Sequence, residues 1–268
     1  MHFSRKRDRN SPADDGFNHR RGTHSFVTSS GHFQRGGFDT IGLRFAGHYS
    51  TSSIITSIIG ADMTQSLKAI FLVGTLKKKQ VLSHTMTLCE VVAEILKSQE
   101  NVKSEIIRLR DYNIQPGTKT EIDNDDWPKI VDKMRASDII IFGTPIWWGI
   151  QSSLIQRSIE RLDELNDELL ATGKSDFANK VGGIVITGDE DGAEHIIGNI
   201  LNFMSWNGFT IPPAPSVTFL GDASEDTKES LKKKFKRRGV YDAASTFARN
   251  EAYLARLLKE NPFPQGEA

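Results

Sequence analysis

The chain contains a single cysteine, Cys89, and lacks any long apolar run. One cysteine cannot close an intrachain disulfide and cannot supply a cysteine-based zinc or iron–sulfur site, so a reducing compartment is expected, by default the cytosol. No apolar run approaches the ~18 residues that a membrane span requires. The sequence therefore predicts a cytoplasmic protein that uses neither a disulfide framework nor a membrane.

Two nucleotide-binding motifs are also missing. No G-x-G-x-x-G follows an expected strand, which argues against a Rossmann dinucleotide site, and no G-x-x-x-x-G-K-[ST] is present, which removes the P-loop nucleotidases. Net charge is lacking as well, since 34 Lys+Arg balance 34 Asp+Glu over 268 residues. Because nucleic-acid binding normally shows as a basic face or stripe, no nucleic-acid partner is expected.

The N-terminal region differs in composition from the rest of the chain. Residues 1–60 hold 8 Lys+Arg against 4 Asp+Glu, leaving 26 against 30 for the remainder. Arg, His, Gly and Ser predominate there, so we interpret residues 1–62 as a disordered extension and 63–268 as the folded domain. A targeting peptide and an ordered arm are alternatives, although Asp8, Asp14 and Asp15 argue against an organelle transit peptide.

Strand and helix patterns alternate through residues 63–268. Apolar strands are expected at 68–73, 104–109, 139–142, 181–187 and 214–219, and amphipathic helices at 85–98, 127–136, 153–169, 193–206 and 241–258. In the third helix Arg161 is expected on the polar face, in the last helix Leu257 is expected to face inward, and the charged stretch 222–238 is expected to be mobile.

This alternation predicts a doubly wound α/β domain. Helical crossovers between parallel strands give a five-stranded parallel sheet in the order 2-1-3-4-5, with helices on both faces. The direction of winding reverses between the first and third strands. A ligand is therefore expected outside the carboxyl ends of these two strands.

The first of two unusual loops at that edge reads G-T-L-K-K-K-Q-V-L-S-H-T, residues 74–85. The hydroxyls of Thr75, Ser83 and Thr85, the charge of Lys77 and the free N–H groups where a helix begins suit a phosphate monoester. The alternative is a solvated lysine run followed by a helix cap. His84 either assists the phosphate or only flanks the cap.

The second loop follows the strand at 139–142 and carries two adjacent tryptophans. Trp147 and Trp148 are bracketed by Pro145 and Gly149, which favours stacking on, or edging, a planar ring, and the backbone of Thr144, Pro145, Ile146 and the residues up to Gly149 is expected at the polar edge of that ring. A hydrophobic plug is one alternative. A dimer interface that takes one of the tryptophans is another.

A third loop, T-G-D-E-D-G-A-E-H, spans residues 187–195. Gly188 and Gly192 permit tight turns, while Glu190 and Asp191 add negative charge, and these four residues are expected to form the far wall of the ligand site. Because nothing else converges on the acidic residues, we interpret them as capping and solvating the next helix, and no metal site is expected.

These three loops, in this order and each after a strand, resemble the flavodoxin-like NADPH-dependent FMN reductase family. G-T-L-K with S-H-T resembles its phosphate loop, T-P-I-W-W-G-x-x-S-S its isoalloxazine-binding loop, and T-G-D-E-D-G-A-E-H its loop after the fourth strand. The likeness covers residues 66–260 and implies FMN as the cofactor. It departs from the family in the first loop, where many members have an arginine after the small residues and a second serine sooner.

The resemblance also implies an activity. NADPH or NADH would reduce bound FMN, and the flavin would pass electrons to a small acceptor such as free flavin or a quinone, in a homodimer or homotetramer. No general acid or base is required, because hydride transfer to the flavin can proceed through orientation alone. A flavodoxin-like electron carrier and an interaction domain that has lost the cofactor are the alternatives, since the fold cannot choose among them.

Overall fold

The computed structural model describes residues 66–189, 191–221 and 227–266, so the predictions for residues 1–62 and for Glu190 concern parts of the chain outside these ranges. The strands are β1 (Leu67–Val73), β2 (Val102–Arg108), β3 (Ile139–Trp147), β4 (Ile150–Gln151), β5 (Val181–Gly188) and β6 (Ser216–Leu220). The helices are α2 (His84–Glu100), α3 (Trp127–Arg135), α4 (Ser153–Glu160), α5 (Asp163–Thr172), α6 (Ala193–Trp206), α7 (Lys228–Arg237) and α8 (Val240–Glu260), with a 3-10 turn at Leu109–Asp111.

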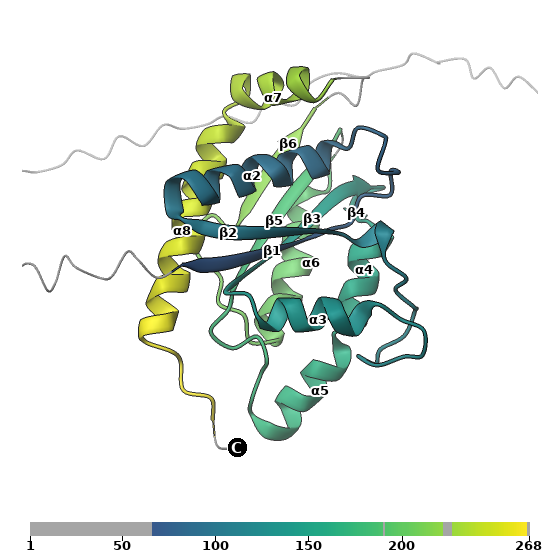
Figure 1. Cartoon of the computed structure of the whole chain (residues 1–268), viewed down its shortest axis with the longest axis vertical. Coiled ribbons are helices and arrows are strands. Elements are labelled where there is room, and N and C mark those ends of the chain that lie inside the picture. The colour runs from purple at the N-terminus through teal and green to yellow at the C-terminus, as the bar shows by residue number, and fades with distance from the viewer. Residues whose placement is uncertain (1–65, 190, 222–226, 267–268) are drawn as a thin grey trace, which may run out of the picture. The chain divides into compact units, whose positions relative to one another are not determined.

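Five parallel strands form the sheet in the order β2-β1-β3-β5-β6, which confirms the predicted doubly wound topology (Figure 1). The two-residue β4 pairs antiparallel with the end of β3. β1 and β3 lie side by side, with Val73 opposite Gly143 at their carboxyl ends. Because the chain winds outward from these two strands in opposite directions, their carboxyl ends bound a crevice.

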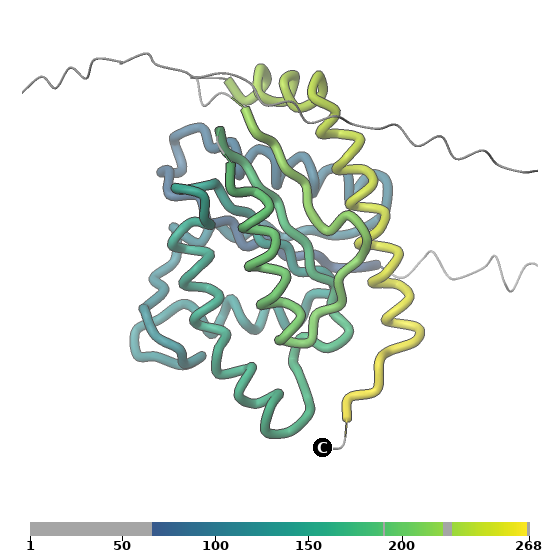
Figure 2. Tube along the Cα trace, turned by 180° about the vertical axis from the view of Figure 1, so that it is seen from behind, coloured from purple at the N-terminus to yellow at the C-terminus, as the bar shows by residue number. Residues whose placement is uncertain are grey.

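Helices cover both faces of the sheet (Figures 1 and 2). One core cluster contains buried residues of the sheet and of α2, α7 and α8, and the other contains buried residues of the sheet and of α3, α4, α5 and α6. Successive residues of β1 alternate between them: Phe71 belongs to the first cluster and Leu72 to the second. A strand with apolar residues on both sides is expected when a parallel sheet is buried on both faces.

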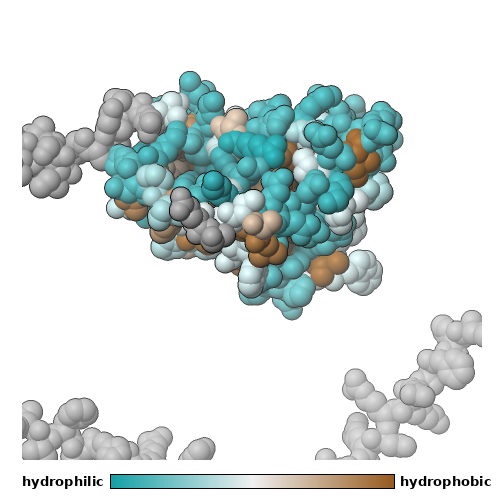
Figure 3. Space-filling model, turned by 90° about the horizontal axis from the view of Figure 1, so that it is seen from below, coloured by the Kyte–Doolittle hydropathy of each residue, from teal (hydrophilic) through white to brown (hydrophobic). Residues whose placement is uncertain are grey.

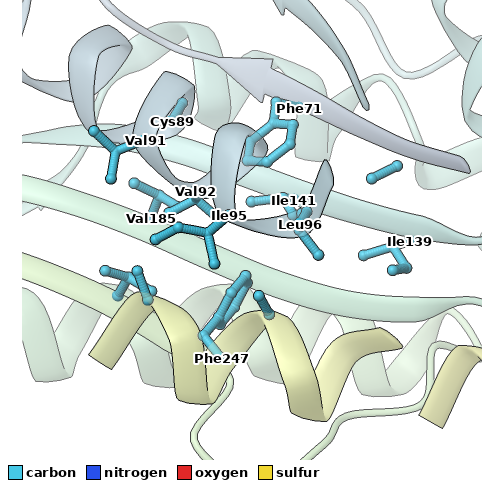
Figure 4. Packing of buried hydrophobic residues seen from close by; sticks show 14 of the residues in the cluster. Phe71, Cys89, Val91, Val92, Ile95, Leu96, Ile139, Ile141, Val185 and Phe247 are labelled. Carbon is cyan, nitrogen blue, oxygen red and sulfur yellow. The ribbon is translucent and has the colours of Figure 1, made fainter. Parts of the chain in front are cut away.

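Figure 4 shows the first cluster, in which Phe247 of α8 points toward the sheet on the side where α2 contributes Val92 and Ile95. Cys89 of α2 is wholly buried in this cluster. Burial raises the pKa of its thiol, with a smaller contribution from Glu90. The cysteine is therefore held as a neutral, inert side chain.

The helix expected at residues 153–169 is broken in two at Arg161, which does not lie on the polar face where it was expected. Its side chain is fully buried. It pairs with Asp125, and its guanidinium donates to the carbonyls of Gln115, Lys119 and Thr120. These partners come from a distant loop, and together they satisfy a cation that would otherwise be too costly to bury.

Two predictions near the C-terminus are wrong. Part of the stretch expected to be mobile forms α7, whose Leu231 and Phe235 are buried, and Phe235 packs edge-on against Phe219 with ring centroids 4.8 Å apart. Its six basic residues obscure this apolar pair in the sequence. Leu257 of α8, expected to face inward together with Phe247 and Leu258, is 42% exposed, whereas Phe247 and Leu258 are buried.

None of the helices in the described ranges is long and apolar enough to cross a membrane. The surface drawn in Figure 3 is predominantly hydrophilic, with hydrophobic residues in small, separate patches.

Candidate functional site

A cavity of about 340 Å³ opens at the carboxyl ends of β1, β3 and β5. The three loops singled out in the sequence all contribute to its wall, which is formed by Thr75, Leu76, Lys77, Ser83, His84, Thr85, Pro145, Ile146, Trp147, Trp148, Thr187, Gly188 and Asp189. Small-molecule sites have volumes of about 300–1,000 Å³. The cavity is therefore large enough for a ligand, and it lies where the topology predicts one.

The loop between β1 and α2 presents a hydroxyl with a spare proton. Ser83 caps α2: its Oγ accepts the Met86 N–H at 3.2 Å and donates to Thr75 Oγ1 at 2.8 Å. The Lys77 N–H also donates to Thr75 Oγ1, at 3.4 Å. Thr75 thus accepts two hydrogen bonds and keeps its own proton for a ligand, at a helix N-terminus whose dipole favours anions. Ser83 positions Thr75 and has already committed its own proton.

A second hydroxyl pair joins the first and third loops. Thr85 Oγ1 on α2 and Thr187 Oγ1 at the end of β5 lie 2.6 Å apart, and both residues are almost fully buried. One hydroxyl donates to the other, so one proton of the pair is left for a ligand. Thr187 was not among the expected site residues, because a threonine at the end of a strand is an ordinary β-sheet residue.

The tryptophans lie on a β-hairpin, although a loop was expected. β3 continues to Trp147, which pairs with Ile150 of β4, and the turn consists of Trp148 and Gly149 with φ of +51° and +79°. Positive φ at both central residues defines the two-residue turn that best fits strand twist. A bulky side chain rarely adopts this conformation, and here it leaves Trp148 93% exposed beside the cavity.

Thr144, Gly149, Asp191 and Gly192 do not line the cavity, although they were expected at the ligand. Thr144 is wholly buried behind the hairpin, where its Oγ1 accepts the Ser152 N–H and donates to the Pro145 carbonyl, both at 2.9 Å. A Cβ on Gly192 would lie 2.6 Å from the Gly149 Cα. Gly149 and Gly192 thus bring the hairpin against the third loop. The residues that line the cavity as expected are Thr75, Lys77, Ser83, Thr85, Pro145, Ile146, Trp147, Trp148 and Gly188.

Leu76 lines the cavity without having been expected there, and His84, for which a phosphate role and a capping role were both open, lines it as well. Asp189, in the third loop, completes this part of the wall. His84 is the first residue of α2, and Asp189 directly follows β5. Both residues lie at the ends of elements that converge on the crevice, and this position is a signal for binding residues that the sequence already contains.

A doubly wound parallel sheet with a hydroxyl-lined helix start and an aromatic hairpin at its switch point defines the class of flavodoxin-like flavoproteins. Residues 67–223 match the model of the family described as NADPH-dependent FMN reductase. The chain belongs to this family of flavin-dependent oxidoreductases.

Two of the individual proteins to which the chain is similar have names that refer to flavin phosphates. The chain is similar to the 8-demethyl-8-aminoriboflavin-5'-phosphate synthase of Streptomyces davaonensis, with 28% identity over 211 residues that cover 74% of this chain and 80% of the relative. It is similar to the structure of RosB with bound 8-demethyl-8-formylriboflavin-5'-phosphate, with 29% identity, a TM-score of 0.62 and coverage of 74% and 82%. A flavone reductase structure, 17% identical with a TM-score of 0.54 over 74% of this chain and 66% of that one, shares the fold.

Proposed function

We propose that the domain binds FMN in this cavity and that NADPH or NADH reduces it for electron transfer to a small acceptor such as free flavin or a quinone. One observation carries the proposal: a hydroxyl-lined helix start and a tryptophan hairpin line the same cavity in a member of the FMN reductase family. The phosphate would lie at Thr75 and Lys77, and the ring against Trp147 and Trp148.

The chemistry of the lining residues fits a phosphorylated flavin. Thr75 has a proton to donate, the start of α2 has a positive dipole end, and Lys77 supplies a cation at the cavity wall. Pro145, Ile146 and the tryptophans supply an apolar wall for a planar ring. Bound FMN would itself supply hydride acceptance and electron transfer. The residues of this chain would hold and orient the reactants, which is sufficient for hydride transfer.

We extend the proposal to a homo-oligomer that forms through the hairpin. Trp148 and Ile150 at its tip are 93% and 50% exposed, which is unusual for adjacent large apolar residues on a monomer surface. A second copy of the chain would cover them and close the cavity. Light scattering on the purified protein tests this, and Ile150→Glu should shift an oligomer toward monomer.

The decisive experiment measures flavin reduction under anaerobic conditions. Protein supplied with FMN should show a bound-flavin spectrum, and NADPH or NADH should bleach it at a rate that saturates with the dinucleotide. FMN should bind more tightly than riboflavin, and Thr75→Ala should reduce this difference, whereas Thr172→Ala on the exposed surface of α5 should not. If neither dinucleotide reduces the flavin within seconds while a reduced partner protein does, the domain is an electron carrier.

A second candidate function is favoured by the similarity to the synthase and to RosB, whose names refer to riboflavin-5'-phosphate derivatives altered at position 8. In that case the flavin phosphate is a substrate that leaves the cavity changed. Mass spectrometry of FMN recovered after aerobic incubation with an amino-acid amino donor separates the two. An unaltered mass supports the reductase, and an altered flavin supports the second candidate.

A further inference from the structure

Arg108, the last residue of β2, is a buried cation with unsatisfied donors. Its side chain is 9% exposed, and its Nε and Nη2 are shielded without a hydrogen-bond partner among the described residues. Asp111, the acidic side chain that it approaches, lies 3.7 Å from Nε and is 45% exposed. That distance is too long for a hydrogen bond. Burying a cation with so little compensation is costly.

Arg161 shows how this domain buries an arginine for structural reasons. Its guanidinium is paired with Asp125 and donates to three backbone carbonyls. Arg108 has no comparable set of acceptors in the described part of the chain. The contrast indicates that the charge of Arg108 has a function other than holding the fold together.

The strand register places Arg108 beside the start of the β1–α2 loop. Its Cα pairs with that of Val73, and Gly74 follows directly. Ile106 packs with the cluster beneath α2, and Ile107 packs with the opposite cluster. Because side chains alternate along a strand, Arg108 faces the side of the sheet on which α2 begins (Figure 1).

Positive charge in this region exceeds negative charge. Residues 74–83 and 108–111 contain Lys77, Lys78, Lys79, Arg108 and Arg110 against Asp111. Arg110 hydrogen bonds the carbonyl of Leu76, so this carbonyl dipole is directed at a cation. The N-terminus of α2 adds a further positive end. A bound anion would neutralise this excess.

We propose that Arg108 is the buried counter-charge for a phosphate held at Thr75 and the start of α2, and that it determines the preference of the site for phosphorylated flavin over riboflavin. The inference rests on the proposed function. Arg108 does not line the cavity, so it acts as a positioning residue through the field beneath the loop. A unit charge acting over roughly 12 Å at an effective dielectric constant of about 20 corresponds to about tenfold in affinity.

The test compares Arg108→Met, which removes the charge at similar length, with Arg108→Lys, which retains it, and with Lys103→Met on the exposed part of the same strand. Affinity for FMN and for riboflavin is measured by flavin fluorescence, and the Tm of the flavin-free protein is measured with and without inorganic phosphate. Arg108→Met should bind FMN about tenfold more weakly than wild type does, and its affinity for riboflavin should be unchanged. Its flavin-free Tm should equal or exceed that of wild type, because an uncompensated buried charge has been removed.

Arg108→Lys should retain most of the FMN preference, and Lys103→Met should behave as wild type. If Arg108→Met loses affinity for FMN and riboflavin equally, or if its flavin-free protein has a lower Tm than wild type, then Arg108 is a structural cation and the inference is overturned. If wild type binds neither flavin, the proposed function fails on its own. The stabilisation by inorganic phosphate then decides the role of Arg108, since it should be present in wild type and absent in Arg108→Met.

Discussion

The hydroxyl oxygens of Thr85 and Thr187 lie 2.6 Å apart, which joins two cavity residues that are 102 positions apart in the chain. Thr187→Val keeps the shape and removes the bond, so the free energy of unfolding should fall by about 1 kcal/mol. FMN affinity should fall several-fold. Thr87→Val is the control, because Thr87 is equally buried and bonds the Ser83 carbonyl but does not itself line the cavity. Equal FMN affinities in the two variants would exclude Thr187 from the site.

Gly192 allows the third loop to meet the tryptophan hairpin. Its φ is +126°, and a Cβ would lie 2.6 Å from backbone atoms of Gly149, which cannot move away cheaply. Gly192→Ala should lower the free energy of unfolding by roughly 1–3 kcal/mol and displace the hairpin, which weakens flavin binding. Gly198→Ala is the matched control on α6, where nothing lies within 4 Å, and it should stabilise by about 0.5–1 kcal/mol. Chemical denaturation measures both, and an unaffected Gly192→Ala would show that the contact is dispensable.

Trp148 has a strained backbone and an exposed side chain, so its effect on folding and its effect on flavin reduction can be measured separately. Trp148→Ala should slow flavin reduction by NADPH or NADH about tenfold while Tm changes little, because the side chain is 93% exposed. Trp148→Asn should raise the unfolding free energy by about 0.5–1 kcal/mol, since asparagine tolerates the left-handed conformation. Trp206→Ala, also exposed but away from the cavity, should leave the rate unchanged. If all three variants reduce the flavin at the same rate, the hairpin tip takes no part in the reaction.

Glu251 makes the stability of the domain depend on pH. Its carboxylate oxygens are buried on α8 without partners among the described residues, and burial raises its pKa well above the ordinary 4.5. The folded state holds the proton more tightly than the unfolded state, so the contribution of Glu251 is complete below about pH 4.5 and is lost as pH rises through the folded pKa. Glu251→Gln cannot ionise, so its stability relative to wild type should rise with pH.

Urea denaturation at several pH values measures this difference. At alkaline pH the Glu251→Gln variant should exceed wild type by roughly 1–3 kcal/mol. Glu260→Gln on the exposed end of the same helix should run parallel to wild type. Parallel curves for Glu251→Gln as well would mean that the carboxyl finds a partner and ionises in place.

The sequence predicts the elements of this domain better than the contacts between them. The apolar run at 139–142 identifies β3 because a strand buried on both faces needs little else. Its continuation to Trp147 depends on a turn whose first central residue is a tryptophan, which no turn preference favours. The burial of Arg161 depends on carbonyls about 40 residues earlier in the chain, and no local pattern reports them.

The same distinction holds for the site. Thr75, Ser83 and Thr85 could be identified because a helix start with hydroxyls suits a phosphate whatever surrounds it. The division of roles between them could not, since it follows from the directions of their hydrogen bonds. Thr187 enters the site only because parallel pairing brings the end of β5 beside β3.

The positions of the tryptophans provide an optical signal for the cavity. Of the four in the chain, Trp127 is fully buried and bonds the Arg161 carbonyl, whereas Trp147 and Trp148 stand at the cavity mouth. Emission from the buried indole should lie toward the blue, and emission from the hairpin and from the exposed Trp206 toward the red. Ligand entry should quench the red emission of the hairpin alone, so in a Trp206→Phe background the unlabelled protein reports occupancy and folding at two ends of one spectrum.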